Sequence, residues 1–134
     1  MINVLLVEDD EEFARKCIEL LSRQNYNVVY CENAERAKKC LFETEITIAI
    51  LDLMLPPTFF QEGVELLRHI RRMRPQIRTI LITAKDAGTT EIVAEAMRMG
   101  AHDFFDKNIA PFDDKLIRKM KEISAEMSGN IFIL

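Results

Sequence analysis

Short apolar runs alternate with segments of helical spacing along the whole chain. Each run is at most six residues of mostly apolar character, without the regular polar alternation of a half-exposed strand. This pattern is typical of strands that are buried on both faces of a sheet. The predicted strands are residues 2–7, Val28–Tyr30, 47–51, Thr79–Ile82 and a segment that contains Phe104-Phe105.

A stripe of apolar residues at helical spacing follows each predicted strand. The five stripes lie within Phe13–Leu21, Ala34–Leu41, Val64–Met73, Ile92–Met97 and Leu116–Met127. Pro75 is expected to end the third helix, Gly100 to cap the end of the fourth, and Asp113 to cap the start of the fifth. Five such strand–helix units predict an α/β fold, a doubly wound parallel sheet with helices on both faces.

Composition places the chain among ordinary globular domains. Its 134 residues are 49% apolar and 30% charged, which fits one domain, and the net charge of −4 argues against a chain that coats nucleic acid. Cys17, Cys31 and Cys40 are odd in number and lack metal-type spacing, which favours a reducing compartment. The chain opens without a signal-like segment, and no apolar stretch approaches the ~20 residues that span a bilayer. We therefore expect a cytoplasmic protein without a membrane partner.

Acidic residues stand at the ends of two of the predicted strands. Glu8 and Asp9 directly follow the first strand, and Asp52 follows the third. In a doubly wound sheet the carboxyl ends of the strands form the ligand site, so these carboxylates are expected to meet there. Like charges at that distance repel, and a hard divalent cation with oxygen ligands removes the conflict. The sequence thus predicts a magnesium-type pocket centred on Asp52.

Two further polar residues end the remaining strands on that edge. Thr83 ends the fourth strand, where a hydroxyl could bond an anion held at Asp52, and Lys107 ends the fifth, where an ammonium could balance the acids. Each alone is weak, because threonine is common in strands and a strand-end lysine is usually a surface residue. The set carries the argument, since the acid pair, Asp52, Thr83 and Lys107 stand at the carboxyl ends of four separate predicted strands.

The set resembles the receiver domain of two-component response regulators, over about residues 2–127. The segments that carry the resemblance are Leu5–Asp10, Ile50–Pro56, Ile82–Ala84 and Gly100–Lys107. The resemblance implies a five-stranded, flavodoxin-like (βα)5 fold for a receiver domain of residues 1–127. Residues 128–134 would then be an apolar tail or the start of a linker to a further domain.

The resemblance also implies a role for each site residue. Asp52 would accept a phosphoryl group from a phosphohistidine, with Thr83 and Lys107 as the groups that contact the acyl phosphate. Asp9, Asp52 and the Met54 carbonyl would hold Mg²⁺ or Mn²⁺, and Glu8 would act mainly through a metal-bound water. Thr83 and Phe104 would form the switch, with Phe104 turning inward when the threonine moves.

The partners implied are a sensor histidine kinase or phosphotransfer protein, and an output domain or self-association through the face of the fourth helix, fifth strand and fifth helix. No direct nucleic-acid contact and no turnover of an outside substrate are expected, only phosphorylation and dephosphorylation of the domain itself. An aspartyl-phosphate phosphatase would need an acid at the position of Met54, and no glycine fingerprint of a dinucleotide-binding domain follows the first strand. The remaining alternative is a receiver-like interaction module that is not regulated by phosphorylation.

Three segments depart from the family pattern. Asn108 stands where a proline usually follows the lysine, which predicts a trans Lys107–Asn108 bond, since a cis bond there costs ~2.5–4 kcal/mol. The loops around residues 56–63 and 85–90 look long.

A basic cluster late in the third helix, around His69, is interpreted as a solvated face near the negative end of the helix dipole.

Overall fold

The computed structural model describes residues 1–55, 60–84, 90–127 and 129. Strands β1 (Asn3–Val7), β2 (Asn27–Cys31), β3 (Ile48–Asp52), β4 (Arg78–Thr83) and β5 (Asp103–Asp106) form one parallel sheet in the order β2-β1-β3-β4-β5. The helices are α1 (Glu11–Arg23), α2 (Ala34–Glu43), α3 (Phe60–Met73), α4 (Thr90–Arg98) and α5 (Phe112–Met127). The predicted α/β, doubly wound fold is confirmed.

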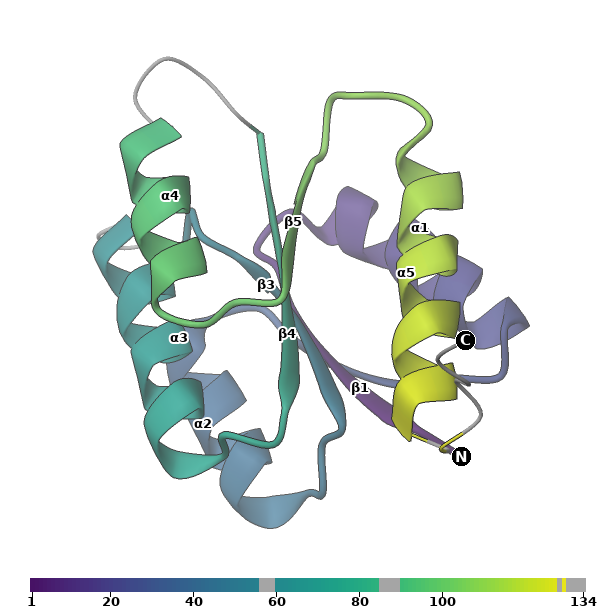
Figure 1. Cartoon of the computed structure of the whole chain (residues 1–134), viewed down its shortest axis with the longest axis horizontal. Helices are drawn as coiled ribbons and strands as arrows, with labels where there is room; N and C mark the ends of the chain where they lie inside the picture. Colours follow the sequence, from purple (N-terminus) through teal and green to yellow (C-terminus); the bar gives the residue numbers. More distant parts are fainter. Residues whose placement is uncertain (56–59, 85–89, 128, 130–134) are drawn as a thin grey trace.

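Helices cover both faces of the sheet (Figure 1). Helices α2, α3 and α4 lie on one face, and α1 and α5 lie on the other. Each side has its own apolar core, because side chains alternate between the faces along every strand. In β1, Leu5 and Val7 pack toward α2–α4, whereas Val4 and Leu6 pack toward α1 and α5. Each fully buried aliphatic side chain of this kind contributes about 1.5–3 kcal/mol.

Local sequence signals set most of the helix ends. Asp10 caps α1, since its Oδ1 accepts hydrogen bonds from the backbone N–H groups of Glu12 and Phe13 at 3.1 and 3.2 Å. Gly100 follows α4 with a φ of 109°, the left-handed conformation of a glycine cap. The predicted cap of α5 was wrong by two residues: the helix begins at Phe112, so Asp113 lies in its first turn. There its carboxylate is still stabilised by the positive end of the helix dipole.

Some sequence predictions fall outside the described residues. The tail of residues 128–134 does so except for Gly129, and so do 56–59 and 85–89 of the two long loops. Within the described part of the chain, the three cysteines are free and buried. No helix there combines the length and the apolar character needed to cross a membrane.

Candidate functional site

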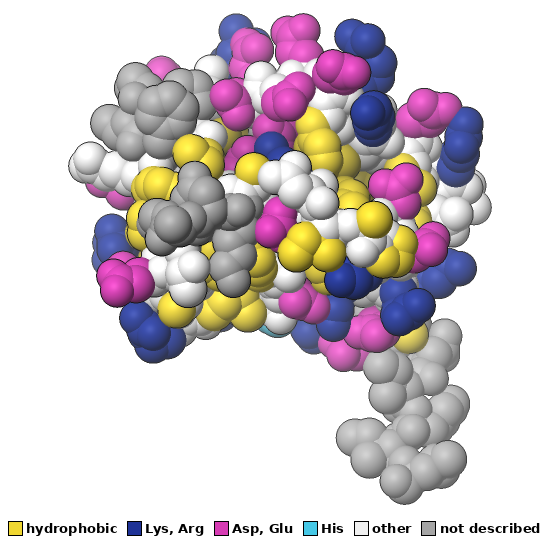
Figure 2. Space-filling view, turned by 90° about the horizontal axis from the view of Figure 1, so that it is seen from above, with side chains coloured by type: hydrophobic (Ala, Val, Ile, Leu, Met, Phe, Trp, Pro, Cys, Tyr) yellow, Lys and Arg dark blue, Asp and Glu magenta, His cyan; other side chains and the backbone are white. Residues whose placement is uncertain are grey.

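The predicted acidic residues meet at the carboxyl edge of the sheet. Strands β1 and β3 are neighbours, with Val7 in register with Leu51, so the residues that follow these positions lie side by side. Carboxylate oxygens of Glu8, Asp9 and Asp52 all lie within 4.8 Å of one another. Figure 2, which looks down on this edge, shows several acidic side chains clustered along one side of the face.

Burial differs sharply among these three carboxylates. Glu8 is fully buried and Asp52 is 3% exposed, whereas Asp9 is exposed. Glu8 Oε1 accepts a hydrogen bond from the backbone N–H of Asp10 at 3.1 Å, and Asp52 Oδ1 accepts one from the N–H of Met54 at 2.9 Å. The strand ends therefore fix Glu8 and Asp52, while Asp9 faces solvent at the mouth of the pocket.

Lys107 reaches the two buried acids from the end of β5. Its Nζ donates to Oε1 of Glu8 and to Oδ2 of Asp52, both at 2.8 Å. Glu8 Oε2 lies 2.6 Å from the same nitrogen, as an ion-pair contact that is not aligned as a hydrogen bond. The backbone N–H of Lys107 donates to the Thr83 carbonyl at 3.0 Å, which ties the start of the β5–α5 loop to the end of β4.

Burial and the neighbouring charge control the protonation of Glu8. Desolvation and, next, the charge of Asp52 raise the pKa of Glu8 from 4.5 to about 7, against the lowering effect of Lys107. For Lys107, desolvation lowers the pKa of the ammonium, but the hydrogen bonds and charges of Asp52 and Glu8 outweigh it and the net shift is upward. One ammonium thus offsets two buried acids incompletely, and negative charge is left over.

This arrangement fits a hard divalent cation. Three carboxylates converge, the excess charge is negative, and Glu8 Oε2 is a buried oxygen without an aligned hydrogen-bond donor. All the donor atoms are carboxylate oxygens, which Mg²⁺ and Mn²⁺ prefer over softer ligands. The acidic edge is thus chemically suited to a magnesium-type ion, with Asp9 as the member nearest to solvent.

The two predicted switch residues lie close to the pocket but play no part in its ion pairs. Thr83 is fully buried and its Oγ1 has no hydrogen-bond partner in the described part of the molecule. Phe104 is partly buried and packs against the core under α2–α4, in register with Leu81 of β4. Met54 is half-buried and contributes its N–H to Asp52.

Comparison with known proteins agrees with this architecture. Residues 4–121 match the sequence model of the response regulator receiver domain, which is most of the chain. The chain belongs to this family. Among curated relatives, a putative NtrX-like response regulator from Rickettsia bellii is 31% identical over 122 residues, covering 90% of this chain and 24% of its own length. The regulatory protein VanR of Enterococcus faecium is 32% identical over 118 residues, covering 88% of this chain and 48% of its own length.

Solved structures share the fold of this receiver domain. A CheY-like receiver domain protein from Methanospirillum hungatei JF-1 superposes with a TM-score of 0.84 at 23% identity, covering 98% of this chain and 99% of that one. NtrX from Brucella abortus, solved in complex with ADP, gives a TM-score of 0.79 at 21% identity; 97% of this chain but only 28% of NtrX is covered. The chain spans about a quarter of the length of the Rickettsia bellii relative and about half of the length of VanR.

Sequence reasoning missed two aromatic residues beside the pocket. The Phe13 ring lies 4.7 Å from Lys107 Nζ, measured to the ring centroid, and Phe13 in turn packs edge-on against Phe112 at 5.3 Å between centroids. Tyr30 donates its hydroxyl hydrogen to the Glu8 carbonyl at 2.8 Å. Phe13 was interpreted only as part of an apolar helix stripe. Its place five residues after Glu8, at the start of α1, was the available signal.

The β5–α5 loop keeps an ordinary backbone at the family's usual proline position. Among the described residues, the only cis peptide bond is Ala110–Pro111, so the predicted trans bond between Lys107 and Asn108 is confirmed. A hollow of about 480 Å³ lies against this loop and is lined by Lys107, Asn108, Ala110, Pro111, Phe112, Asp113 and Asp114.

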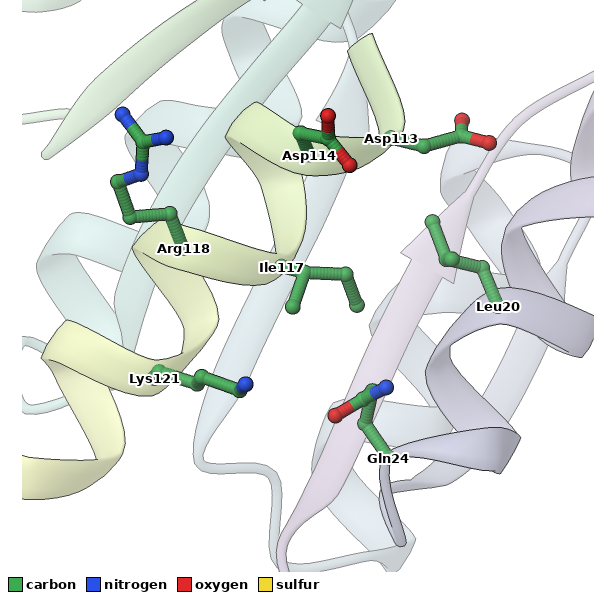
Figure 3. Close-up of a pocket in the computed structure, with 7 residues that line it drawn as sticks. All are labelled: Leu20, Gln24, Asp113, Asp114, Ile117, Arg118 and Lys121. Atoms are coloured by element: carbon green, nitrogen blue, oxygen red, sulfur yellow. The ribbon is translucent and has the colours of Figure 1, made fainter. Parts of the chain in front are cut away.

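A second hollow lies on the α1–α5 side of the receiver domain and is unrelated to the acidic edge. It measures about 470 Å³, and Leu20 and Ile117 extend toward each other across it (Figure 3). Gln24, Arg118 and Lys121 are among its other lining residues. None of the predicted site residues lines it, so we assign it no chemistry.

Proposed function

We propose that this receiver domain is a phosphorylation-activated signalling switch in which Asp52 accepts a phosphoryl group. The observation that carries the proposal is the setting of the Asp52 carboxylate at the carboxyl edge. It is nearly buried, it is held through Oδ1 by the Met54 N–H, and its Oδ2 faces the Lys107 ammonium at 2.8 Å. A carboxylate that is fixed and paired with a cation is a competent nucleophile toward phosphorus.

The phosphoryl donor is a phosphohistidine on a sensor histidine kinase or a phosphotransfer protein. An Asp52 oxygen supplies the electron pair of the new O–P bond, and the P–N bond breaks with its electrons returning to the imidazole. Lys107 is placed to offset the negative charge that spreads over the phosphoryl oxygens. The hollow along Lys107–Asp114 offers room beside the pocket for the donor's surface.

Mg²⁺ or Mn²⁺ is the cofactor of this proposal. When bound, the ion supplies positive charge next to the phosphoryl oxygens. Asp9, Asp52 and the backbone carbonyl of Met54 would hold it directly, and Glu8 would act mainly through a water. The excess negative charge of the pocket and the raised pKa of Glu8 support this set, because a cation relieves the same repulsion that raises that pKa.

Thr83 and Phe104 form the proposed switch. The buried Thr83 hydroxyl lacks a partner within the described residues, so a phosphoryl group on Asp52 would give it an acceptor. Its movement would free space for Phe104, which packs partly buried in the neighbouring strand. The rearranged face of α4, β5 and α5 would then bind an output domain or a second copy.

The domain itself is proposed to act in the cytoplasm, without direct contact to nucleic acid or membrane. It would catalyse only its own phosphorylation and dephosphorylation. Output activities belong to other domains: the relative from Thermotoga maritima named a cyclic di-GMP phosphodiesterase is matched over only 27% of its length.

Mass spectrometry after incubation with acetyl phosphate and Mg²⁺ tests the proposal. We expect one added phosphoryl group on the wild-type chain, none on Asp52→Asn, and normal labelling of the control Asp114→Asn, which removes an exposed acid. Equal labelling of Asp52→Asn would overturn the assignment of the acceptor. A wild-type chain that takes up no phosphoryl group from acetyl phosphate or a phosphorylated kinase would favour the alternative, an interaction module that is not phosphorylated.

A further inference from the structure

Two large apolar side chains are exposed together on the surface formed by α2 and α3. Phe42 in α2 is 85% exposed and Met73 in α3 is 55% exposed. Both line a hollow of about 140 Å³, together with Leu41, Lys38, His69 and Arg74. A dry cavity of about 150 Å³ can hold a benzene-sized group, so this one has room for a single apolar side chain.

The hollow continues along α3 into a second one of about 300 Å³. The two share Lys38, His69 and Met73 in their walls, and the second adds Glu65, Arg68 and Arg72. Together they form a continuous groove between α2 and α3, which pack side by side on one face of the sheet (Figure 1). We call this the α2–α3 groove; Leu41, Phe42 and Met73 make its smaller part apolar, and charged side chains line most of the larger part.

The rim of the α2–α3 groove is basic in a chain whose net charge is −4. Its charged residues are Lys38, Arg68, Arg72, Arg74 and a single acid, Glu65. Within the described residues, Lys38, Arg68 and Arg72 have no carboxylate within ion-pair distance, whereas Arg23 and Arg78 each have one and Lys119 has two. Three cations are therefore left unneutralised along the groove, with Lys38 beside the apolar hollow and Arg68 and Arg72 beside the second one.

The pKa of His69, in the wall of the groove, is also affected by the positive charges nearby. Burial lowers the pKa of His69, and the charges of Lys38, Arg74 and Arg72 lower it further. Three separate cations, in α2, in α3 and just after α3, thus act on the imidazole of His69. A partner that brings negative charge here would be attracted by all three.

We infer that the α2–α3 groove docks an acidic amphipathic segment of a partner protein, with one apolar side chain seated between Phe42 and Met73. Basic side chains around an apolar anchor pocket are complementary to a helix that carries carboxylates beside an aliphatic stripe. A second copy in symmetric contact is disfavoured, because it would place basic rim against basic rim. Nucleic acid is disfavoured because the net charge of the chain is −4 and the exposed apolar pair of Phe42 and Met73 stands among the cations of the groove.

This surface is separate from the acidic edge that carries the proposed phosphorylation. None of the groove residues belongs to that site, and the groove lies on α2 and α3 rather than on the α4-β5-α5 face. The inference therefore does not depend on phosphorylation of Asp52. It assigns the receiver domain a second contact surface, defined by charge and shape.

The experiment is a ¹H–¹⁵N NMR titration of the whole chain with a synthetic helical peptide that carries leucines on one face and glutamates beside them. We expect shift changes in α2 and α3, and binding that weakens as salt rises. Phe42→Ser and Arg72→Glu should each weaken affinity about tenfold, in the range of an interface anchor. The matched controls Ile109→Ser and Lys16→Glu, an exposed apolar residue and a cation elsewhere, should leave affinity unchanged.

Two further peptides and one further protein variant test the inference. A peptide of the same composition in scrambled order should bind much more weakly, and a peptide with lysine in place of glutamate should not bind the groove. Asp52→Asn should leave the affinity unchanged, which separates this test from that of the proposed function. The inference would be overturned by shift changes confined to other helices, or by equal binding of the lysine peptide. It would also be overturned if a short DNA duplex perturbed α2 and α3 while the acidic peptide did not.

Discussion

Gly63 in α3 lies so close to Leu53 that a Cβ atom at Gly63 would be 2.1 Å from the Leu53 carbonyl oxygen. The neighbouring atoms are backbone, which cannot rotate away as a side chain could. Leu53 directly follows Asp52, so the contact presses the first turn of α3 against the chain that leaves the predicted phosphoryl acceptor. The absence of a side chain at Gly63 is thus a condition for the position of Asp52.

Gly63→Ala is expected to displace this segment. Overpacking in a closed site costs typically about 1–3 kcal/mol, and the shift should also disturb the Met54 N–H that holds Asp52. We expect a lower free energy of unfolding in urea, together with slower phosphorylation by acetyl phosphate. Gln61→Ala, on the exposed side of the same helix, is the control; equal behaviour of the two variants would contradict the role of Gly63.

The fold and the acidic part of the site were predictable because their signals are local. Each strand is a short apolar run, and the residue that follows it in sequence, such as Asp9 after β1, stands at the carboxyl edge once the strands are parallel. The same reasoning about strand ends also placed Lys107 near Glu8, although 99 residues separate them in the sequence. No knowledge of loop geometry was needed for any of these.

The contacts that the sequence did not predict depend on packing between distant elements. Phe13 looks like any apolar helix residue until α1 and β5 are brought together with Lys107. The closeness of Gly63 to Leu53, and the exposure of Phe42 beside Met73, likewise follow from how α3 lies on its neighbours. The error at Asp113 has another cause. The Pro111 carbonyl already accepts a helical hydrogen bond from the Lys115 N–H at 3.1 Å, and sequence signals place helix ends less well than helices.

The pH dependence of stability should report the burial of Glu8. Its pKa is about 7 in the folded chain and 4.5 without the fold, so between these values the folded state binds more protons. The stabilisation present below pH 4.5 is lost as pH rises through about 7, and its size is on the order of 3 kcal/mol. Glu8→Gln should remove this decline.

Urea unfolding at pH 5, 6 and 7 in the presence of a chelator measures the effect. Asp52→Asn should also flatten the decline, because the Asp52 charge is one of the two causes that raise the pKa of Glu8. The exposed Glu43→Gln serves as the control. A decline in Glu8→Gln as steep as in the wild type would place the titrating group elsewhere.

Lys107→Met tests how far one ammonium stabilises the two acids. The substitution keeps the length of the side chain but leaves Glu8 and Asp52 facing each other without a cation. Breaking a buried pair in this way typically costs about 3–5 kcal/mol, and Lys107 is only 13% exposed. We expect that loss in metal-free urea unfolding at pH 7 and a partial recovery at pH 5, where Glu8 takes up a proton. A loss independent of pH would mean that packing, not charge, sets the cost.

The last prediction concerns Phe13 as a positioning residue for Lys107. The ring centroid lies 4.7 Å from the ammonium nitrogen, and the edge-on contact with Phe112 holds the ring in place. A cation over an aromatic face gains ~0.5–2 kcal/mol, more where water is excluded. Phe13→Leu keeps an apolar side chain but removes this attraction, whereas Phe13→Tyr keeps it.

We therefore expect Phe13→Leu to make the Lys107 ammonium group more mobile without unfolding the domain. The ¹⁵Nζ signal of Lys107 should broaden or shift, and phosphorylation by acetyl phosphate should slow several-fold, with Phe13→Tyr close to the wild type. Phe105→Leu, which removes a ring that also packs edge-on against Phe112, controls for loss of aromatic packing alone. If Phe13→Leu and Phe105→Leu slow phosphorylation equally and leave the Lys107 signal unchanged, Phe13 acts through packing. If only Phe13→Leu changes both, the ring holds the ammonium in the pocket, and the position five residues after the first acid becomes a part of the site that can be identified from sequence.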